Sequence, residues 1–170
     1  GPIIKNKLSF ISNIRFCNFG MASIILKAFV ENFDFFYYFY DANLKLNYII
    51  SPKDKVDFTI YNGKDNFKSS QKDKYTLTES SIYYFNINSQ KIRWGNFLNS
   101  IRWTHIYNNN IFQKIVLGYS HYFFYTDNTN KTYEVKDTIL NSFLNYSKTQ
   151  TTDFFAKIDF EVFINSTNKL

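Results

Sequence analysis

The chain has 170 residues, enough for one ordinary domain, with 20 lysines and arginines against 14 aspartates and glutamates. The basic residues are scattered, so the net charge of +6 does not indicate nucleic-acid binding. A single cysteine, Cys17, excludes an intrachain disulfide. Aromatic residues make up 21% of the chain, and because aromatic side chains favour strands, the composition predicts an all-β protein.

The sequence shows neither an export signal nor a helical membrane span. Its first residues, "GPIIKNKLSF", lack the apolar core and the cleavage site of a secretory signal. The stretch "MASIILKAFVENFDFFYYFY" comes closest to a span, but Lys27, Glu31 and Asp34 interrupt it. If the protein is exported, we expect its precursor to be longer than this sequence.

Six stretches alternate apolar and polar residues with a period of two, which is typical of strands with one apolar and one polar face. We expect strands at residues 7–16, 37–50, 55–63, 94–107, 111–125 and 153–163. The apolar face is predicted to lie against lipid and to include Leu44, Leu46, Phe58, Ile101, Leu117, Ile158 and Phe160.

The predicted connections alternate in length along the chain. Segments 17–36, 64–91 and 126–152 are long, whereas 52–54 and 108–110 are short. Antiparallel neighbours place all the long connections at one end of a sheet. Long outer loops with short periplasmic turns are the layout of an outer-membrane barrel. The sequence therefore predicts an all-β fold, an antiparallel transmembrane β-barrel segment of about six strands.

A loop of three residues at each short turn gives both hairpins apolar pairs on one face. In the first hairpin it pairs Tyr48 with Phe58, and in the second it pairs Ile101 with Leu117. A slip of one residue would mix the faces, so the register is well defined. The asparagines at 108–110 tolerate the left-handed conformation that such a turn needs.

Two architectures are compatible with this alternation. Several predicted strands exceed the ~5–6 residues usual in globular sheets, and a tilted membrane strand needs about 9–11. The alternative is a soluble β-sandwich with an aromatic core, an aromatic-rich binding module, which would not depend on detergent. Tyrosine and tryptophan near the strand ends favour the membrane barrel, since they would form interfacial girdles: Tyr37, Tyr38, Tyr40, Trp94, Tyr107 and residues 122–125.

Several segments, in order, resemble the barrel of TonB-dependent receptors, most closely those of bacteroidete-type outer membranes. They are "GPIIKNKLSF", "YYFYDANLKLNYIISPKDKVDFTIYNGKDNF", "RWGNFLNSIRWTHIYNNNIFQKIVLGYSHYFF" and "DFFAKIDFEVF". The family has a Trp-Gly-Asn segment followed by an Arg-Trp-Asn-His-like one, paired with a strand ending in Tyr-Ser-Arg-Tyr. This chain departs from that pattern at Thr104 and His121, and both changes are conservative for a strand.

This resemblance implies that residues 1–170 are part of a barrel of about 22 strands with a plugged lumen. Receptors of this kind import scarce, large ligands such as iron chelates, cobalamin or glycans, with energy from TonB. On this resemblance, we expect the plug domain and the remaining strands to lie outside this sequence. The partners implied are outer-membrane lipid, the rest of the barrel and plug, and TonB.

The sequence contains no enzyme signature, and we expect neither catalysis, nor a cofactor, nor a metal site. His105 and His121 are expected on the lipid-facing side, near opposite ends of one hairpin. We interpret Asp57, Asp159 and Glu161 as wall charges that face a polar lumen. The long loops are the expected ligand contacts, with no single residue assigned. A solvated charge run is predicted within the second loop: Lys64, Lys68, Lys72 and Lys74.

The strands at 7–16 and 153–163 contain neither proline nor glycine, the residues that commonly protect a free sheet edge. We therefore expect each of them to be paired on both sides. It follows that the segment should fold only within an intact receptor.

Overall fold

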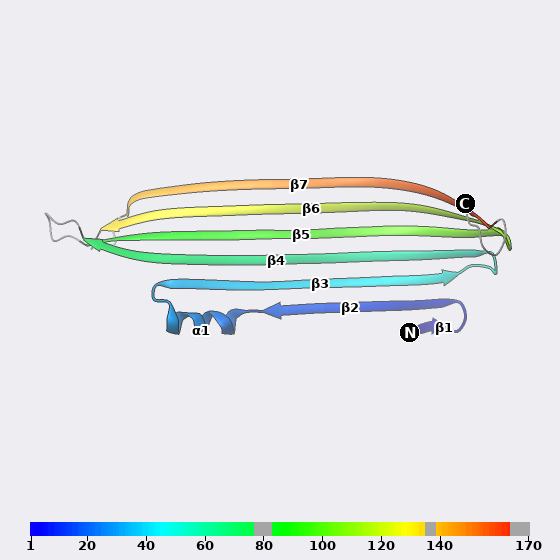
Figure 1. The fold of residues 1–170 in the computed structure, drawn as a ribbon, viewed down its shortest axis with the longest axis horizontal. Helices are drawn as coiled ribbons and strands as arrows, with labels where there is room; N and C mark the ends of the chain where they lie inside the picture. The colour runs from blue at the N-terminus through cyan, green and yellow to red at the C-terminus, as the bar shows by residue number, and fades with distance from the viewer. Residues whose placement is uncertain (77–82, 135–138, 164–170) are drawn as a thin grey trace.

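The computed structural model describes residues 1–76, 83–134 and 139–163. The described residues form one antiparallel sheet of seven strands and one helix (Figure 1). In chain order the elements are β1 (Pro2–Ile4), β2 (Leu8–Asn18), α1 (Gly20–Phe29), β3 (Phe33–Ile49), β4 (Asp54–Thr76), β5 (Tyr83–Asn108), β6 (Ile111–Glu134) and β7 (Ile139–Val162).

The sheet is an up-and-down meander, in which each strand pairs with its neighbours in sequence. The connections predicted to be long therefore all follow strands that end at one end of the sheet, and the short turns lie at the other end (Figure 1). This confirms the predicted fold class, the antiparallel segment of a barrel wall. The sheet has one strand more than expected, because β1 pairs with the start of β2 through Pro2 opposite Ser9 and Ile4 opposite Leu8.

The strands are much longer than the sequence pattern suggested. β4 continues to Thr76 and β5 begins at Tyr83, so most of the predicted loop at 64–91 is strand. β6 and β7 likewise extend to Glu134 and from Ile139. The prediction failed because these stretches have no apolar face. A strand with water on both sides shows no apolar–polar alternation, although its backbone can still pair.

The register predicted for one of the two hairpins is confirmed, and the register predicted for the other is wrong. The β5–β6 register is confirmed, with Ile101 opposite Leu117. The β3–β4 register was wrong by two residues, because Tyr48 lies opposite Val56 instead of Phe58. Here the turn closes between Ser51 and Asp54, where each backbone N–H donates to the carbonyl of the other at 3.2 Å. A shift of two residues keeps every side chain on its predicted face.

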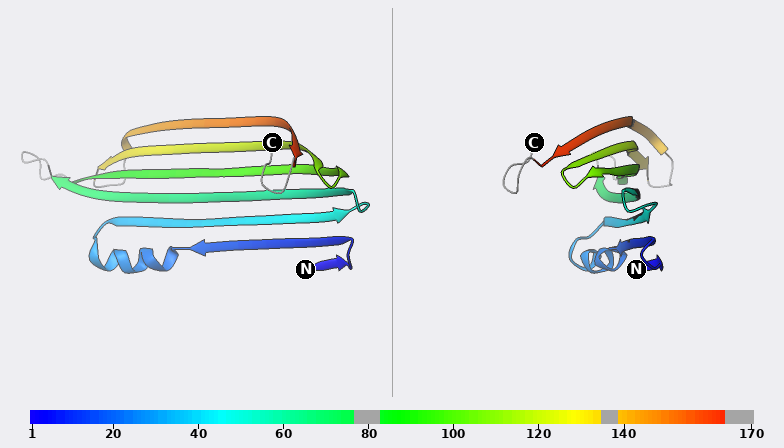
Figure 2. Two further views of the ribbon diagram at one scale, coloured as in Figure 1. Left: turned by 45° about the vertical axis from the view of Figure 1, so that its right-hand side comes forward. Right: turned by 90° about the vertical axis from the view of Figure 1, so that its right-hand side faces the viewer.

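Helix α1 lies within the predicted connection 17–36, where no helix was expected. It continues the line of β2 and runs beside β3 (Figure 1; Figure 2). Asn18 caps its start, since its Oδ1 accepts a hydrogen bond from Gly20 N at 2.8 Å. Asn32, with φ of 61°, adopts the left-handed conformation that follows many helices. No helix in the described ranges combines the length and the apolar character required to cross a membrane.

The sheet is a single layer without a core (Figure 2). No apolar side chain is buried in the described part of the chain, and the buried polar side chains there are Asp57 and Asn66, 6% and 5% exposed. The two-sheet sandwich is therefore not formed by the described residues. Large apolar side chains stand exposed on one face, among them Phe10, Ile14, Phe16, Ile101, Leu117, Phe154, Ile158 and Phe160.

The predicted aromatic girdle is correct only in part. Tyr38 and Tyr40 lie on the apolar face, as expected. Tyr37 and Trp94 lie on the opposite face, where their rings stack with centroids 6.3 Å apart. Tyr122 also lies on that face, since it pairs with Asn96. Because side chains alternate along a strand, a cluster of consecutive aromatics cannot lie on one face.

Candidate functional site

The apolar face carries a continuous uncharged band across β2 to β7. One row of cross-strand partners shows its composition: Phe10, Leu46, Phe58, Ile101, Leu117 and Ala156. The predicted set of apolar residues lies on this face. Charged or ionisable side chains bound the band, with Asp54 and Lys64 on β4 and Arg93 and His105 on β5. We call these uncharged rows the apolar band.

The height of the apolar band matches a lipid bilayer. From Asp54 to Lys64, β4 advances about 33 Å, and a strand tilt of about 45° reduces this to about 24 Å across the membrane. Outer-membrane barrels carry an outward apolar band about 25 Å tall. The strands β4 to β7 are far longer than this and extend well past the band at the end with the long connections (Figure 1).

At the end of the sheet with the short turns, the Asp54 carboxylate forms hydrogen bonds with the residues at the boundary of the apolar band. Its Oδ1 accepts hydrogen bonds from Trp103 Nε1 at 3.1 Å and contacts His105 Nδ1 at 2.7 Å. Ser51 Oγ donates to its Oδ2 at 2.8 Å. The hydrogen bonds from His105 and Ser51 stabilise the carboxylate and lower the pKa of Asp54 below its ordinary value. Tyr107 packs edge-on against His105 with ring centroids 4.6 Å apart, which completes an aromatic group at this boundary.

His121 lies on the same face as His105, as predicted. Its Nδ1 is 2.8 Å from Thr152 Oγ1 on β7. Residues 1–76, 83–134 and 139–163 contain no cluster of three histidine, cysteine, aspartate or glutamate residues that could hold a metal ion. Each histidine therefore has a local hydrogen-bond partner, Asp54 for His105 and Thr152 for His121.

On the polar face, the three predicted wall charges all lie in polar networks. Asp57 Oδ1 accepts a hydrogen bond from Asn47 Nδ2 at 2.6 Å and lies 3.8 Å from Lys55 Nζ. Near the turn end of β7, Asp159 pairs with Lys157 at 2.9 Å. Glu161 pairs with Lys114 on β6. The polar face near the short turns is therefore lined with charged side chains that form ion pairs with one another.

Halfway along the polar face, an aromatic and acidic cluster joins β2, β3 and β4. Arg15 binds Asp41 through Nε at 2.8 Å, and its guanidinium stands 5.4 Å from the ring centroid of Phe39. Tyr37 donates a hydrogen bond to Asp65 at 2.5 Å. A cavity of about 220 Å³ opens among Arg15, Tyr37, Phe39, Tyr40, Asp41, Tyr61, Gly63 and Asp65.

Beyond this cluster, the polar face is lined with side-chain amides. Asn130 Nδ2 donates to Asn88 Oδ1 at 2.5 Å across β5 and β6. A cavity of about 290 Å³ lies over this part of the sheet, between Phe33 and Phe143. Side-chain amides both donate and accept hydrogen bonds, so this surface suits an uncharged polar ligand. The amides that line the cavity are Gln71, Asn88, Gln90, Asn128 and Asn130.

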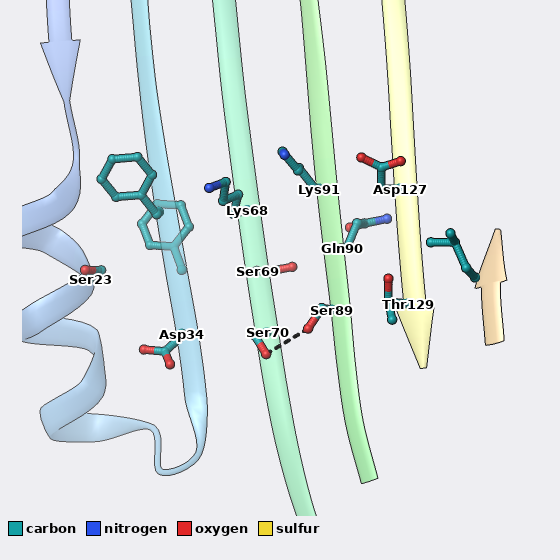
Figure 3. Close-up of a pocket in the computed structure, with 13 residues that line it drawn as sticks. Ser23, Asp34, Lys68, Ser69, Ser70, Ser89, Gln90, Lys91, Asp127 and Thr129 are labelled. Carbon is teal, nitrogen blue, oxygen red and sulfur yellow. Dashed lines mark hydrogen bonds between the residues drawn. The ribbon is translucent and has the colours of Figure 1, made fainter. Parts of the chain in front are cut away.

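The predicted charge run lies on a strand instead of in a loop. All four lysines occupy even-numbered positions of β4, so they lie on the same face as the apolar band. Even spacing was the signal in the sequence that could have shown this. A cavity of about 830 Å³ lies toward the end of the sheet opposite the short turns. It is lined by Lys68 and Lys91, by Asp34 and Asp127, and by polar residues of β4 to β6 (Figure 3).

Comparison with known proteins gives a match at the level of the fold. No family model matches the sequence, and no curated protein is detectably similar to it. Among solved structures, the chain is similar to the RagAB peptide importer in its "open-open" state, with a TM-score of 0.50 and 8% identity. That match covers 79% of this chain and 17% of the importer chain. The "closed-closed" state of the same importer gives a TM-score of 0.48, 10% identity and coverage of 78% and 17%.

At such low identity the likeness shows the fold alone. The seven-stranded antiparallel meander has the fold of part of the importer chain in the "open-open" structure, which is consistent with a segment of a barrel wall. The chain spans about a sixth of the length of the importer chain that it matches.

Proposed function

We propose that this chain is a wall segment of an outer-membrane receptor that takes up a large, scarce ligand with energy from TonB. The observation that supports the proposal is the apolar band, which crosses six strands and has the height of a bilayer. In water such a surface would aggregate, whereas lipid would cover it at no cost. The opposite face is polar and charged, as the wall of an aqueous lumen would be.

The partners in this proposal are outer-membrane lipid, the rest of the barrel with its plug, and TonB. Beyond Phe10, no described strand pairs with the outer edge of β2, and none pairs with the outer edge of β7. Unpaired backbone groups in hydrocarbon are costly, so further strands are required on both sides. The shared fold with part of a larger importer chain agrees with this requirement.

The proposed ligand contacts lie on the polar face beyond the height of the apolar band. There the aromatic and acidic cluster around Tyr37 and the amides around Asn88 and Asn130 offer stacking and uncharged hydrogen bonds. Such a surface suits a neutral polymer such as a glycan or a peptide, and the structurally similar importer is named for peptides. The proposal assigns the chain no catalysis and no cofactor.

The test follows the complete product of the gene in its own cells. After membrane fractionation, the product should be in the outer-membrane fraction and migrate on gels in a heat-modifiable way. Deletion of the gene, or of TonB, should abolish growth on the same limiting nutrient. Recovery of the product in a soluble fraction, or growth that needs the gene but not TonB, would contradict the proposal.

A further inference from the structure

A group of basic residues stands on the apolar face directly beyond the apolar band, at the end with the long connections. We call this group the outer basic patch: Lys64 and Lys68 on β4, Lys91 and Arg93 on β5, and Lys148 on β7. Within the described residues, the carboxylate that lies among these cations is Asp127, and Asp34 lies one row further out (Figure 3). The patch therefore has a strong positive excess.

Two of these lysines repel each other across neighbouring strands. Lys68 and Lys91 are direct cross-strand partners on one face, and Figure 3 shows them side by side. Like charges that are directly opposite destabilise a sheet. Neither ammonium group forms an ion pair with a carboxylate in the described ranges. An anion placed between them would remove this repulsion.

The neighbouring row holds its cations in fixed positions. Arg93 Nη2 lies 3.6 Å from Asp127 Oδ2, and its guanidinium stands 5.5 Å from the ring centroid of Tyr125. Lys148 Nζ stands 5.6 Å from the centroid of the same ring. Tyr125 also accepts a hydrogen bond from Gln150 at 2.9 Å. These contacts pre-organise the cations, which lowers the cost of binding an anion.

Two donors in this row lack an acceptor. Asn66 is 5% exposed, and its Nδ2 has no hydrogen-bond partner within the part of the chain that the structure describes. The same is true of Arg93 Nε, and Arg93 is the direct cross-strand partner of Asn66. Buried donors are almost always paired in native proteins. A neighbouring pair of unpaired donors beside several cations points to an anionic oxygen that is absent from the protein itself.

We propose that the outer basic patch binds the phosphate of a lipid head group in the outer leaflet of the membrane. The inference rests on the proposed function and on the barrel layout in which the end with the long connections faces the outside of the cell. The apolar band gives the reason for a lipid: Gly95 and Phe123 lie in the same row as Lys64, where the patch meets the band, so acyl chains along the band would end at the patch. Basic clusters at a membrane boundary attract anionic head groups in this way.

Arginine and lysine together suit a phosphate monoester. The guanidinium can donate two parallel hydrogen bonds to phosphate oxygens, while the lysines act as point charges around them. Tyr146 on β7 is exposed and stacks on Tyr125, with ring centroids 6.5 Å apart. Its open face could lie against a sugar ring, so a phosphorylated glycolipid fits the patch.

The test uses the complete gene product, purified in detergent, and native mass spectrometry with two probes: lipid A, and lipid A from which phosphatase has removed the phosphates. The wild-type protein should retain the phosphorylated lipid and lose the dephosphorylated one. The triple variant Lys64→Gln/Lys91→Gln/Lys148→Gln should bind lipid A roughly a hundredfold more weakly, since each of the three cations near a membrane surface contributes about a factor of five. The matched control Lys45→Gln/Lys55→Gln/Lys157→Gln removes the same charge from the polar face and should bind normally.

Equal retention of both lipids, or equal loss in the patch variant and the control, would overturn the proposal. Displacement of lipid A by millimolar inorganic phosphate would also overturn it, because the site would then be one for a free anion. Heat-modifiable migration identifies folded protein, and if the triple variant does not fold, Lys148→Gln alone tests the patch, since Lys148 is exposed on β7. A protein that retains lipid A but supports no uptake would contradict the transport proposal and leave this one standing.

Discussion

Phe155 on β7 covers Gly118 on β6, its direct cross-strand partner, and its ring fills the space where a Cβ atom would stand at position 118. The same relationship joins β5 and β6 on the other face. There a Cβ atom at Gly95 would lie 2.6 Å from the ring of its partner Phe123. An aromatic ring that packs over a glycine in the next strand protects the exposed backbone and helps to define the register.

We predict that Gly118→Val destabilises the folded gene product by about 1–3 kcal/mol, because the added side chain must displace the ring of Phe155. The measurement is a denaturant titration of the protein in lipid vesicles. Ser120→Val, two residues along the same face and opposite Asp153, is the matched control and should have a much smaller effect. Similar losses of folding free energy in the two variants would show that the position of the Phe155 ring does not require a glycine at residue 118.

The apolar band should tolerate no charge at its centre. Leu117 is 52% exposed in the sheet, and its row continues through Ile101 and Leu46. We predict that Leu46→Arg or Leu117→Arg costs about 2–4 kcal/mol of folding free energy in vesicles, as for arginine near a bilayer midplane.

The matched controls for these charges lie on the polar face. Asn47→Arg and Ser100→Arg place the same charge on β3 and β5 but toward the other side of the sheet. They should cost much less in the same folding titration. Equal costs on the two faces would show that the apolar band does not contact lipid.

Asp54 should stabilise the short-turn boundary in a pH-dependent way. Its hydrogen bonds from His105 and Ser51 lower its pKa, so the folded state favours the carboxylate. The contribution is fully present above the ordinary aspartate pKa of about 3.9 and is lost as the pH falls through the depressed pKa of the folded state. We therefore predict that Asp54→Asn lowers the unfolding midpoint at pH 7, and that its difference from the wild type vanishes in strong acid.

Asp153→Asn provides the control for this titration, because Asp153 lies on the polar face of β7, away from His105 and Ser51. Its difference from the wild type should not change with pH in the same manner. A difference for Asp54→Asn that stays constant from neutral pH to strong acid would exclude the role of the charged carboxylate.

The 170-residue chain produced alone should not give a stable monomer. β1 covers β2 only as far as Phe10, which bonds to Gly1 through both its N–H at 3.0 Å and its carbonyl at 2.7 Å. The remaining edge of β2 and the whole outer edge of β7 have no partner in the described sheet. In hydrocarbon each unpaired backbone group costs several kcal/mol, so we expect aggregates, or a detergent-bound sheet without heat-modifiable migration. A monomer that melts cooperatively in plain buffer would refute both this expectation and the membrane proposal.

The sequence by itself determined the faces of the sheet and its topology. Alternation is a local property of an extended chain, so the side on which Leu46, Phe58 or Leu117 lies follows from the residue numbers alone. The alternating long and short connections predicted the meander, and the apolar alternation on both sides of residues 108–110 predicted the β5–β6 register. These features depend only on neighbours in sequence. The left-handed conformation expected at 108–110 is not adopted there, since none of these three asparagines has a positive φ.

Only the tertiary structure determined the features that depend on pairing between strands, namely the β3–β4 register, the strand lengths and the cross-strand contacts. The Ser51–Asp54 turn moved the β3–β4 register by two residues, and backbone pairing extended β4 to β7 through polar stretches that show no alternation. Register then placed Lys68 opposite Lys91, and Phe155 over Gly118. No local pattern contains this information, because a cross-strand neighbour is chosen by the turn geometry and by hydrogen bonds between residues far apart in sequence.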